Sequence, residues 1–192
     1  IEACLVGSEM CIRDSKKDCE NLVNETIKKY GKLDGLINSA YRAGDFKEIE
    51  DSDFDDWHET MNTNFFGTMN LTMAAVKEMV PNKEGAIVMI NSLITKKPLP
   101  TQGGYAASKG ALSTATKILA KELGPKGIRV NSVYMGWMWG PPVEMYVNFT
   151  AESMGVEPSD VINGVTKDIP LGIIPDDSDC ANAALFLISD LA

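Results

Sequence analysis

Apolar residues along this chain alternate between helical spacing and short continuous runs. Between Ser15 and Tyr30 they recur every three or four positions and stop at Gly31, a pattern that predicts an amphipathic helix ended by glycine. The next segment, Leu33 to Asn38, is a short apolar run that suits a buried strand. The chain therefore opens its regular part with a helix followed by a strand.

The same alternation continues to the last residues. Ser52 is a plausible N-cap for a long helix that runs to Val80, before Pro81, with a bend near Gly67. Further strands are predicted over 85–91 and 128–133, and further helices over 103–123 and 176–191. Strands that alternate with helices favour a parallel sheet with helices on both faces, whose ligands bind at the carboxyl ends of the strands.

Tyr105 and Lys109 lie four residues apart on a predicted helix, and Ser92 ends a predicted strand. Residues at this spacing share a helix face, so the phenol and the ammonium can enter one cleft. An ammonium at roughly 4 Å is worth up to about 4 kcal/mol at a dielectric of 20, enough to lower the pKa of Tyr105 by about two to three pH units. The three side chains thus predict an acid/base site.

Five segments occur in an order and spacing that resemble the short-chain dehydrogenase/reductase family, and the likeness runs from about residue 15 to the C-terminus. They are Leu33-Asp34-Gly35-Leu36-Ile37-Asn38-Ser39-Ala40, Asn64-Phe65-Phe66-Gly67, Ile87-Val88-Met89-Ile90-Asn91-Ser92, Tyr105-Ala106-Ala107-Ser108-Lys109 and Ile128-Arg129-Val130-Asn131-Ser132-Val133. The resemblance implies a Rossmann-like doubly wound parallel sheet in a three-layer α/β/α fold. It also implies that Ser92 orients the substrate oxygen, Tyr105 is the acid/base, Lys109 also binds the nicotinamide ribose, and Asn64 holds a proton-relay water.

The resemblance further implies a bound NAD or NADP. Its contacts are expected from Asn38, Ser39, Ala40, Tyr105, Lys109, Gly136 and Met138. Two positions depart from the family pattern, because Tyr41 stands where a glycine is usual and Gly140 where a threonine is usual. Tyr41 is expected to narrow or line the site.

The family's Gly-rich turn for the pyrophosphate is missing before residue 31, and its last strand is missing after Leu191. The sequence therefore predicts a fragment that is incomplete at both ends, in which residues 1–14 are a non-native or disordered lead-in and 15–192 a partial Rossmann-like domain. The strand over 33–38 would then have an unpaired edge. The residue that selects NAD or NADP would lie upstream.

Composition and net charge exclude some classes of binding partner. The 192 residues are 44% hydrophobic and 23% charged, with a net charge of −9, which argues against nucleic acid and anionic membrane as partners. No signal peptide or apolar run of spanning length appears, which favours the cytoplasm. The four cysteines have no metal-ligand spacing and are expected to be free thiols, the single histidine, His58, is expected on the surface, and no metal is expected.

The sequence thus predicts an oxidoreductase that interconverts a secondary alcohol and a ketone. The segment 136–170, rich in aromatic residues and methionine, is expected to be the substrate loop and favours a lipophilic or aromatic small molecule. The helices over 52–80 and 104–123 are expected to form a homodimer or homotetramer. Two alternatives stay open: an isomerase, epimerase or dehydratase that keeps its cofactor bound, and a truncated module that retains the assembly surfaces without catalysis.

Overall fold

The computed structural model describes residues 4–7 and 15–192, which divide into two compact units, one of 1–134 with 184–192 and one of 135–183. The first unit holds the sheet and the helices that cover it. Its elements up to the first long strand are β1 (Cys4–Gly7), α2 (Lys16–Tyr30), β2 (Gly35–Asn38), the 3-10 turn η1 (Ile49–Asp51), α3 (Phe54–Met61), the π-helical segment η2 (Asn62–Gly67), α4 (Thr68–Asn82) and β3 (Gly85–Ser92). Then follow η3 (Leu93–Thr95), α5 (Gly103–Leu123), η4 (Gly124–Lys126), β4 (Ile128–Met135), α6 (Pro141–Met154), α7 (Pro158–Thr166) and α8 (Asp177–Ile188).

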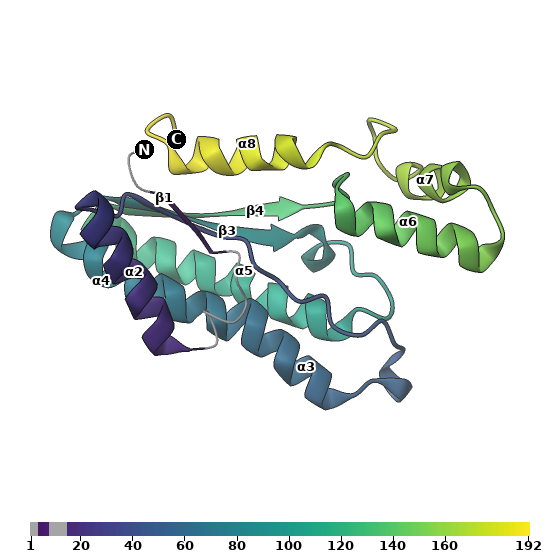
Figure 1. The fold of residues 1–192 in the computed structure, drawn as a ribbon, viewed down its shortest axis with the longest axis horizontal. Coiled ribbons are helices and arrows are strands. Elements are labelled where there is room, and N and C mark those ends of the chain that lie inside the picture. Colours follow the sequence, from purple (N-terminus) through teal and green to yellow (C-terminus); the bar gives the residue numbers. More distant parts are fainter. Residues whose placement is uncertain (1–3, 8–14) are drawn as a thin grey trace. The chain divides into compact units, whose positions relative to one another are not determined.

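The four strands form one sheet in the order β1-β2-β3-β4. β1 pairs with β2 and β2 with β3 in parallel, with Ile37 opposite Val6 on one side and Val88 on the other. β3 and β4 point the same way in Figure 1. The predicted parallel α/β sheet is therefore confirmed, and its carboxyl edge carries Asn38 and Ser92.

The pairing of β1 with β2 contradicts one expectation. The sequence predicts an unpaired edge on the strand over 33–38, yet Cys4–Gly7 pairs with β2 along its whole length, so that prediction is wrong. A run of four residues is too short to show a strand periodicity, and its pairing depends on a partner strand about thirty residues away. The remaining part of the predicted lead-in, residues 1–3 and 8–14, lies outside the described residues.

Both faces of the sheet are covered by helices. Leu36 and Ile87 point into a core shared with α2, α4 and α5, which Figure 1 shows gathered on one side of the strands. Their neighbours Ile37 and Val88 point the other way, against Ala184 and Ile188 of α8. This alternation confirms the three-layer α/β/α arrangement, because each strand has an apolar side chain toward either helix layer.

The long helix predicted from Ser52 to Val80 consists of three helical segments. It begins at Asp53, whose carboxylate accepts from the Asp55 amide at 2.9 Å, so the N-cap is Asp53 rather than Ser52. The π-helical segment η2 separates α3 from α4, and α4 continues past Pro81 to Asn82. The other predicted helices agree closely with α2, α5 and α8, because their caps and apolar spacing are local features.

The second unit corresponds to the predicted substrate loop, and most of it is helical. Val147 and Ala151 are the buried residues of α6. The Trp139 amide donates to the Pro175 carbonyl at 2.7 Å, and the Asp177 amide donates to the Trp139 carbonyl at 3.2 Å, so the two ends of this unit pair with each other. Within the described ranges, none of the helices is both long and apolar enough to cross a membrane.

Candidate active site

Asn64 lies in η2, and its side chain joins three parts of the first unit. Its Oδ1 accepts from the Arg42 amide at 2.7 Å, and its Nδ2 donates to the Arg42 carbonyl at 2.9 Å and to Ser108 Oγ at 2.9 Å. The side chain is 1% exposed. Single π-helical turns often mark functional sites, because they redirect one side chain out of the regular helical register. Asn64 therefore fixes the segment after β2 against the first turns of α5.

Ser92 is the last residue of β3, and its backbone is held by its neighbour Asn91. Asn91 Oδ1 accepts from the Ser92 amide at 2.8 Å, and Ser92 Oγ accepts from the Ile94 amide at 3.2 Å as the cap of η3. Asn91 is 2% exposed, and its Nδ2 has no partner among the described residues. Asn91 was not predicted as a site residue from the sequence. A polar amide in an otherwise apolar strand, directly before Ser92, was a usable signal.

Tyr105 lies in the first turn of α5, which packs against Trp57 of α3. A Cβ on Gly103 would lie 2.3 Å from Cζ2 of Trp57, and one on Gly104 would lie 3.0 Å from Cγ. Glycine at both positions allows the indole to contact the helix backbone directly. Ser108 Oγ donates to the Tyr105 carbonyl at 2.7 Å, so the turn that carries the phenol is held from both sides.

Lys109 is 3% exposed, and its ammonium donates to the Ile90 carbonyl at 2.8 Å. The Nζ atom also lies 5.7 Å from the centroid of the Tyr105 ring. Ile90 precedes Ser92 by two residues on β3. The structure thus brings Tyr105 and Lys109 to the end of β3 that carries Ser92, as the sequence predicts.

The ionisation of Tyr105 differs from the expectation. Burial raises the pKa of Tyr105 above its ordinary value, a hydrogen bond with the Ser92 side chain opposes the rise, and the neighbouring Tyr41 adds to it. The predicted lowering of this pKa is wrong for this structure, because burial of the phenol is the largest influence on it and acts in the opposite direction. The protonated phenol is therefore the favoured form.

The expected cofactor residues divide between the two units. Asn38 is 2% exposed, and its Nδ2 donates to Thr72 Oγ1 at 3.1 Å, while its Oδ1 meets no partner in the described part of the chain. Ser39 and Ala40 follow it and are partly buried. Gly136 and Met138 belong to the second unit, so their place beside Tyr105 stays a prediction.

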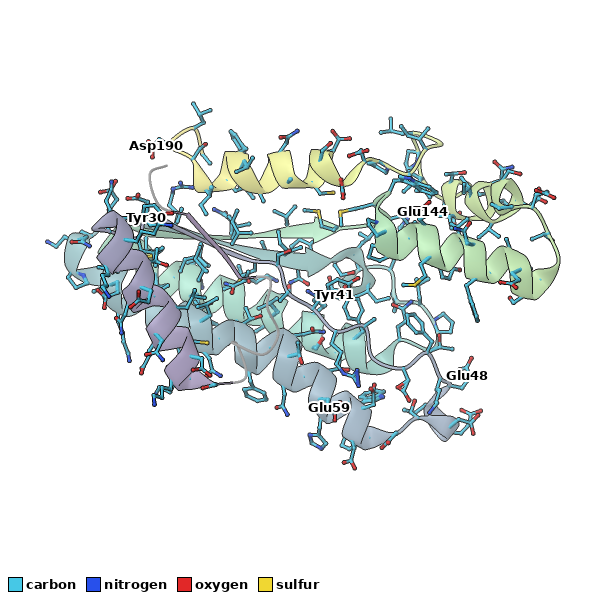
Figure 2. All side chains as sticks on the ribbon, in the orientation of Figure 1. Tyr30, Tyr41, Glu48, Glu59, Glu144 and Asp190 are labelled. Carbon is cyan, nitrogen blue, oxygen red and sulfur yellow. The ribbon has the colours of Figure 1, made fainter. Side chains whose placement is uncertain are left out.

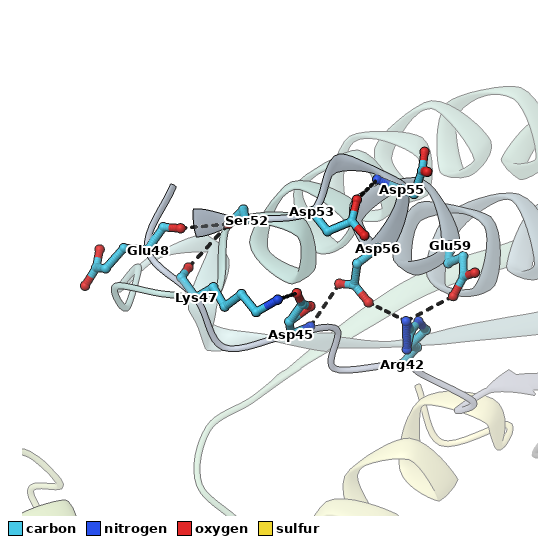
Figure 3. Close-up of polar contacts among 9 residues, drawn as sticks. All are labelled: Arg42, Asp45, Lys47, Glu48, Ser52, Asp53, Asp55, Asp56 and Glu59. Atoms are coloured by element: carbon cyan, nitrogen blue, oxygen red, sulfur yellow. Dashed lines mark hydrogen bonds and ion pairs between the residues drawn. The ribbon is translucent and has the colours of Figure 1, made fainter. Parts of the chain in front are cut away.

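Charged residues fix the segment that follows Ala40 (Figure 3). Arg42 forms ion pairs with Asp56 and, at 3.0 Å, with Glu59. The Asp45 amide donates to Asp56 Oδ2 at 2.9 Å, and Lys47 pairs with the Asp45 carboxylate at 2.9 Å. Both Asp45 and Asp56 thus have cationic or amide partners, and nowhere in residues 4–7 or 15–192 do three His, Cys, Asp or Glu side chains gather as a metal site would require.

The prediction for His58 is confirmed, and the prediction of free thiols is confirmed for Cys180. His58 is exposed and contacts the edge of the Phe54 ring, with centroids 5.0 Å apart. Cys180 is a free thiol, and burial raises its pKa. Neither residue belongs to the site.

Known proteins resemble this chain in sequence and in fold. A family model described as enoyl-(acyl carrier protein) reductase matches residues 12–192. The 3-oxoacyl-[acyl-carrier-protein] reductase FabG of Thermotoga maritima is 32% identical over 178 residues, which are 93% of this chain and 66% of that protein. A structure of NAD+-bound xylitol dehydrogenase superposes with a TM-score of 0.85 at 26% identity, covering 95% of this chain and 72% of that one. A variant of actinorhodin polyketide ketoreductase with NADPH superposes with a TM-score of 0.84 at 28% identity, covering 93% and 69%.

The sheet, the helix layers and these matches define a Rossmann-like α/β protein. The chain belongs to the short-chain dehydrogenase/reductase family, as the order of its motifs predicts. It spans just under two thirds of the length of curated relatives such as FabG, at 66%, and the oxidoreductase UcpA of Escherichia coli O157:H7, at 63%.

Proposed function

We propose that the protein interconverts a secondary alcohol and a ketone, with NAD or NADP as the redox partner. The observation that supports this most directly is the grouping of Tyr105 and Lys109 at the end of β3 that carries Ser92. A hydroxyl, a phenol and an ammonium at one edge of a parallel sheet can bind a carbonyl oxygen and move a proton to it.

In the reductive direction each side chain has one task. Tyr105 donates its proton to the carbonyl oxygen, and its raised pKa keeps that proton in place at neutral pH. The Ser92 hydroxyl donates a hydrogen bond to the same oxygen, and the Lys109 charge stabilises the negative charge that develops there. The nicotinamide ring, when bound, supplies or accepts the hydride.

The cofactor assignment rests on residues at the carboxyl edge. The buried Lys109 ammonium and the unsatisfied Asn38 Oδ1 offer a donor and an acceptor of the kind that ribose and amide groups require. The related xylitol dehydrogenase structure contains NAD+ and the ketoreductase variant contains NADPH, and we propose that this protein also binds NAD or NADP. The proposed contacts are Asn38, Ser39, Ala40, Tyr105, Lys109, Gly136 and Met138.

The second unit supports a lipophilic or aromatic substrate. Its α6 leaves Met145 69% and Phe149 71% exposed, and the Trp137 and Tyr146 rings lie 5.2 Å apart. Exposed apolar side chains of this kind are typical of a pocket wall or an adaptable cover. We therefore propose the chemical class of the substrate and name no particular molecule.

Self-association is proposed through α4 and α5. Met73 of α4 and Ile118 of α5 are 53% and 51% exposed, and Phe66 of η2 is 53% exposed. Half-exposed large apolar residues on long helices favour a homodimer or homotetramer. Size-exclusion chromatography with light scattering tests this, and a monomer at micromolar concentration would contradict it. The cytoplasmic location stays a prediction.

The test of the activity is net oxidation of NADH or NADPH by a panel of ketones. Tyr105→Phe should lower kcat by about 10²- to 10⁴-fold, the usual contribution of a general acid. Tyr30→Phe is the matched control, since Tyr30 lies on α2 and is 52% exposed. Near-normal turnover by Tyr105→Phe would refute the assignment of the acid. Product formation without net cofactor oxidation would instead favour the isomerase, epimerase or dehydratase.

A further inference from the structure

Tyr41, labelled in Figure 2, lies on the segment between β2 and α3. Its ring centroid is 6.2 Å from that of Tyr105, and the two ring planes meet at 62°. Tyr41 is 46% exposed. In an edge contact the border of one ring meets the face of the other, and nearly half of the Tyr41 surface stays open to a ligand.

The backbone next to Tyr41 is held tightly. Both the amide and the carbonyl of Arg42 bond to the Asn64 side chain, at 2.7 and 2.9 Å, and the guanidinium of Arg42 pairs with Asp56. A residue clamped through its backbone and its side chain cannot swing away without breaking all of these contacts. Tyr41 is therefore attached to a fixed point, although its own ring is half exposed.

The same Asn64 side chain reaches Tyr105. Asn64 Nδ2 donates to Ser108 Oγ, and Ser108 Oγ donates to the Tyr105 carbonyl at 2.7 Å. One chain of hydrogen bonds thus links the neighbour of Tyr41 to the backbone of Tyr105. These bonds hold together the two backbone segments that carry the rings, and the side-chain torsions then set the angle between the rings.

Two rings inclined at 62° form a corner. A ketone whose oxygen is bonded by Tyr105 has its carbonyl carbon close to both rings, so one of its substituents can reach Tyr41. A planar substituent can stack on the Tyr41 ring, whereas a puckered or branched group of equal size contacts the ring with fewer atoms. Aromatic pairing of this kind is worth up to about tenfold in affinity.

We propose that Tyr41 determines substrate shape, favouring ketones that carry an aryl or other planar conjugated group beside the carbonyl over ketones with saturated rings. This inference rests on the proposed function and names the substrate class for the same site. Tyr41 acts here by contact with the substituent, and it takes no part in the proton transfer.

The test compares acetophenone with cyclohexyl methyl ketone, which match in carbon skeleton and differ in ring planarity. The wild-type protein should show a kcat/KM for acetophenone that is higher by up to about tenfold. Tyr41→Ala should abolish most of this preference, mainly through the KM of acetophenone, and Tyr41→Phe should retain it. Tyr30→Ala, which removes an exposed ring from α2, should leave the ratio unchanged.

An unchanged ratio in Tyr41→Ala, or an equal loss in Tyr41→Phe and Tyr41→Ala, overturns the proposal. A protein that oxidises neither NADH nor NADPH with any ketone of the panel overturns the proposed function instead. The shape preference is then measured as the ratio of the two ketones' dissociation constants by NMR titration. A ratio that Tyr41→Ala shifts and Tyr41→Phe does not would keep the proposal, and a ratio that no variant shifts would overturn it.

Discussion

The side chain of Asn64 offers the sharpest test of how the site is held together. In Asn64→Leu a side chain of similar size loses three hydrogen bonds, two to Arg42 and one to Ser108. Each such bond contributes about 1 kcal/mol net. Because Asn64 is 1% exposed, water cannot easily replace the lost partners. We expect the free energy of unfolding to fall by about 3 kcal/mol, roughly a 150-fold change in the folded to unfolded ratio.

Urea unfolding followed by circular dichroism measures this loss as a lower midpoint at an unchanged slope. Asn24→Leu is the control, since Asn24 is exposed on α2, and should change stability by less than about 0.5 kcal/mol. A double-mutant cycle with Ser108→Ala should give a coupling of about 1 kcal/mol for the bond between Asn64 and Ser108. A loss below about 1 kcal/mol in Asn64→Leu would refute the role of this side chain as a clamp.

Gly127→Ala should cost about 3 kcal/mol or more, because Gly127 has φ +78° and its added Cβ would lie 2.0 Å from the Lys83 carbonyl oxygen. Gly110 lies inside α5, and an added Cβ there would meet no described atom within 4 Å. Gly110→Ala should therefore stabilise the protein by about 0.5 to 1 kcal/mol. Thermal melts that show the same effect for both glycine substitutions would contradict this difference. Burial raises the pKa of Tyr105, so the folded chain binds this proton more tightly than the unfolded chain, and stability should decline as the pH rises above about 10. Tyr105→Phe should lessen this alkaline decline. Ser92→Ala should deepen it, because the hydrogen bond with Ser92 opposes the rise of the Tyr105 pKa. Denaturant titrations at several pH values can check both, and identical declines in all three proteins would contradict the assignment.

The order of helices and strands could be read from the sequence because it depends on neighbouring residues. Ser15 caps α2, with its Oγ accepting from the Asp18 amide at 3.2 Å, and Gly31 ends it at φ 80°. Each cap lies within one turn of the apolar pattern that it bounds, so both ends were predictable. The same holds for α5, whose bounds agree with the prediction at Gly103 and Leu123.

Other features depend on residues that are distant in the sequence. β1 is a strand because β2 provides its partner, and η2 interrupts a helix that periodicity alone would continue. The expected lowering of the Tyr105 pKa failed for a similar reason, since burial by distant segments raises this pKa instead. Spacing places Lys109 on the correct helix face, but it cannot tell that the ammonium donates to Ile90, nineteen residues away.

The sequence by itself determined the fold class, the family and the set of Ser92, Tyr105 and Lys109, since these follow from local periodicity and from the order of short motifs. The tertiary structure alone decided how that set is held and how it ionises. Asn64 reaches Ser108 across 44 residues, and burial, which sets the direction of the Tyr105 pKa, exists only once the layers have packed. Hydrogen bonds between distant segments and the loss of solvent are properties of the packed chain, so no local pattern encodes them.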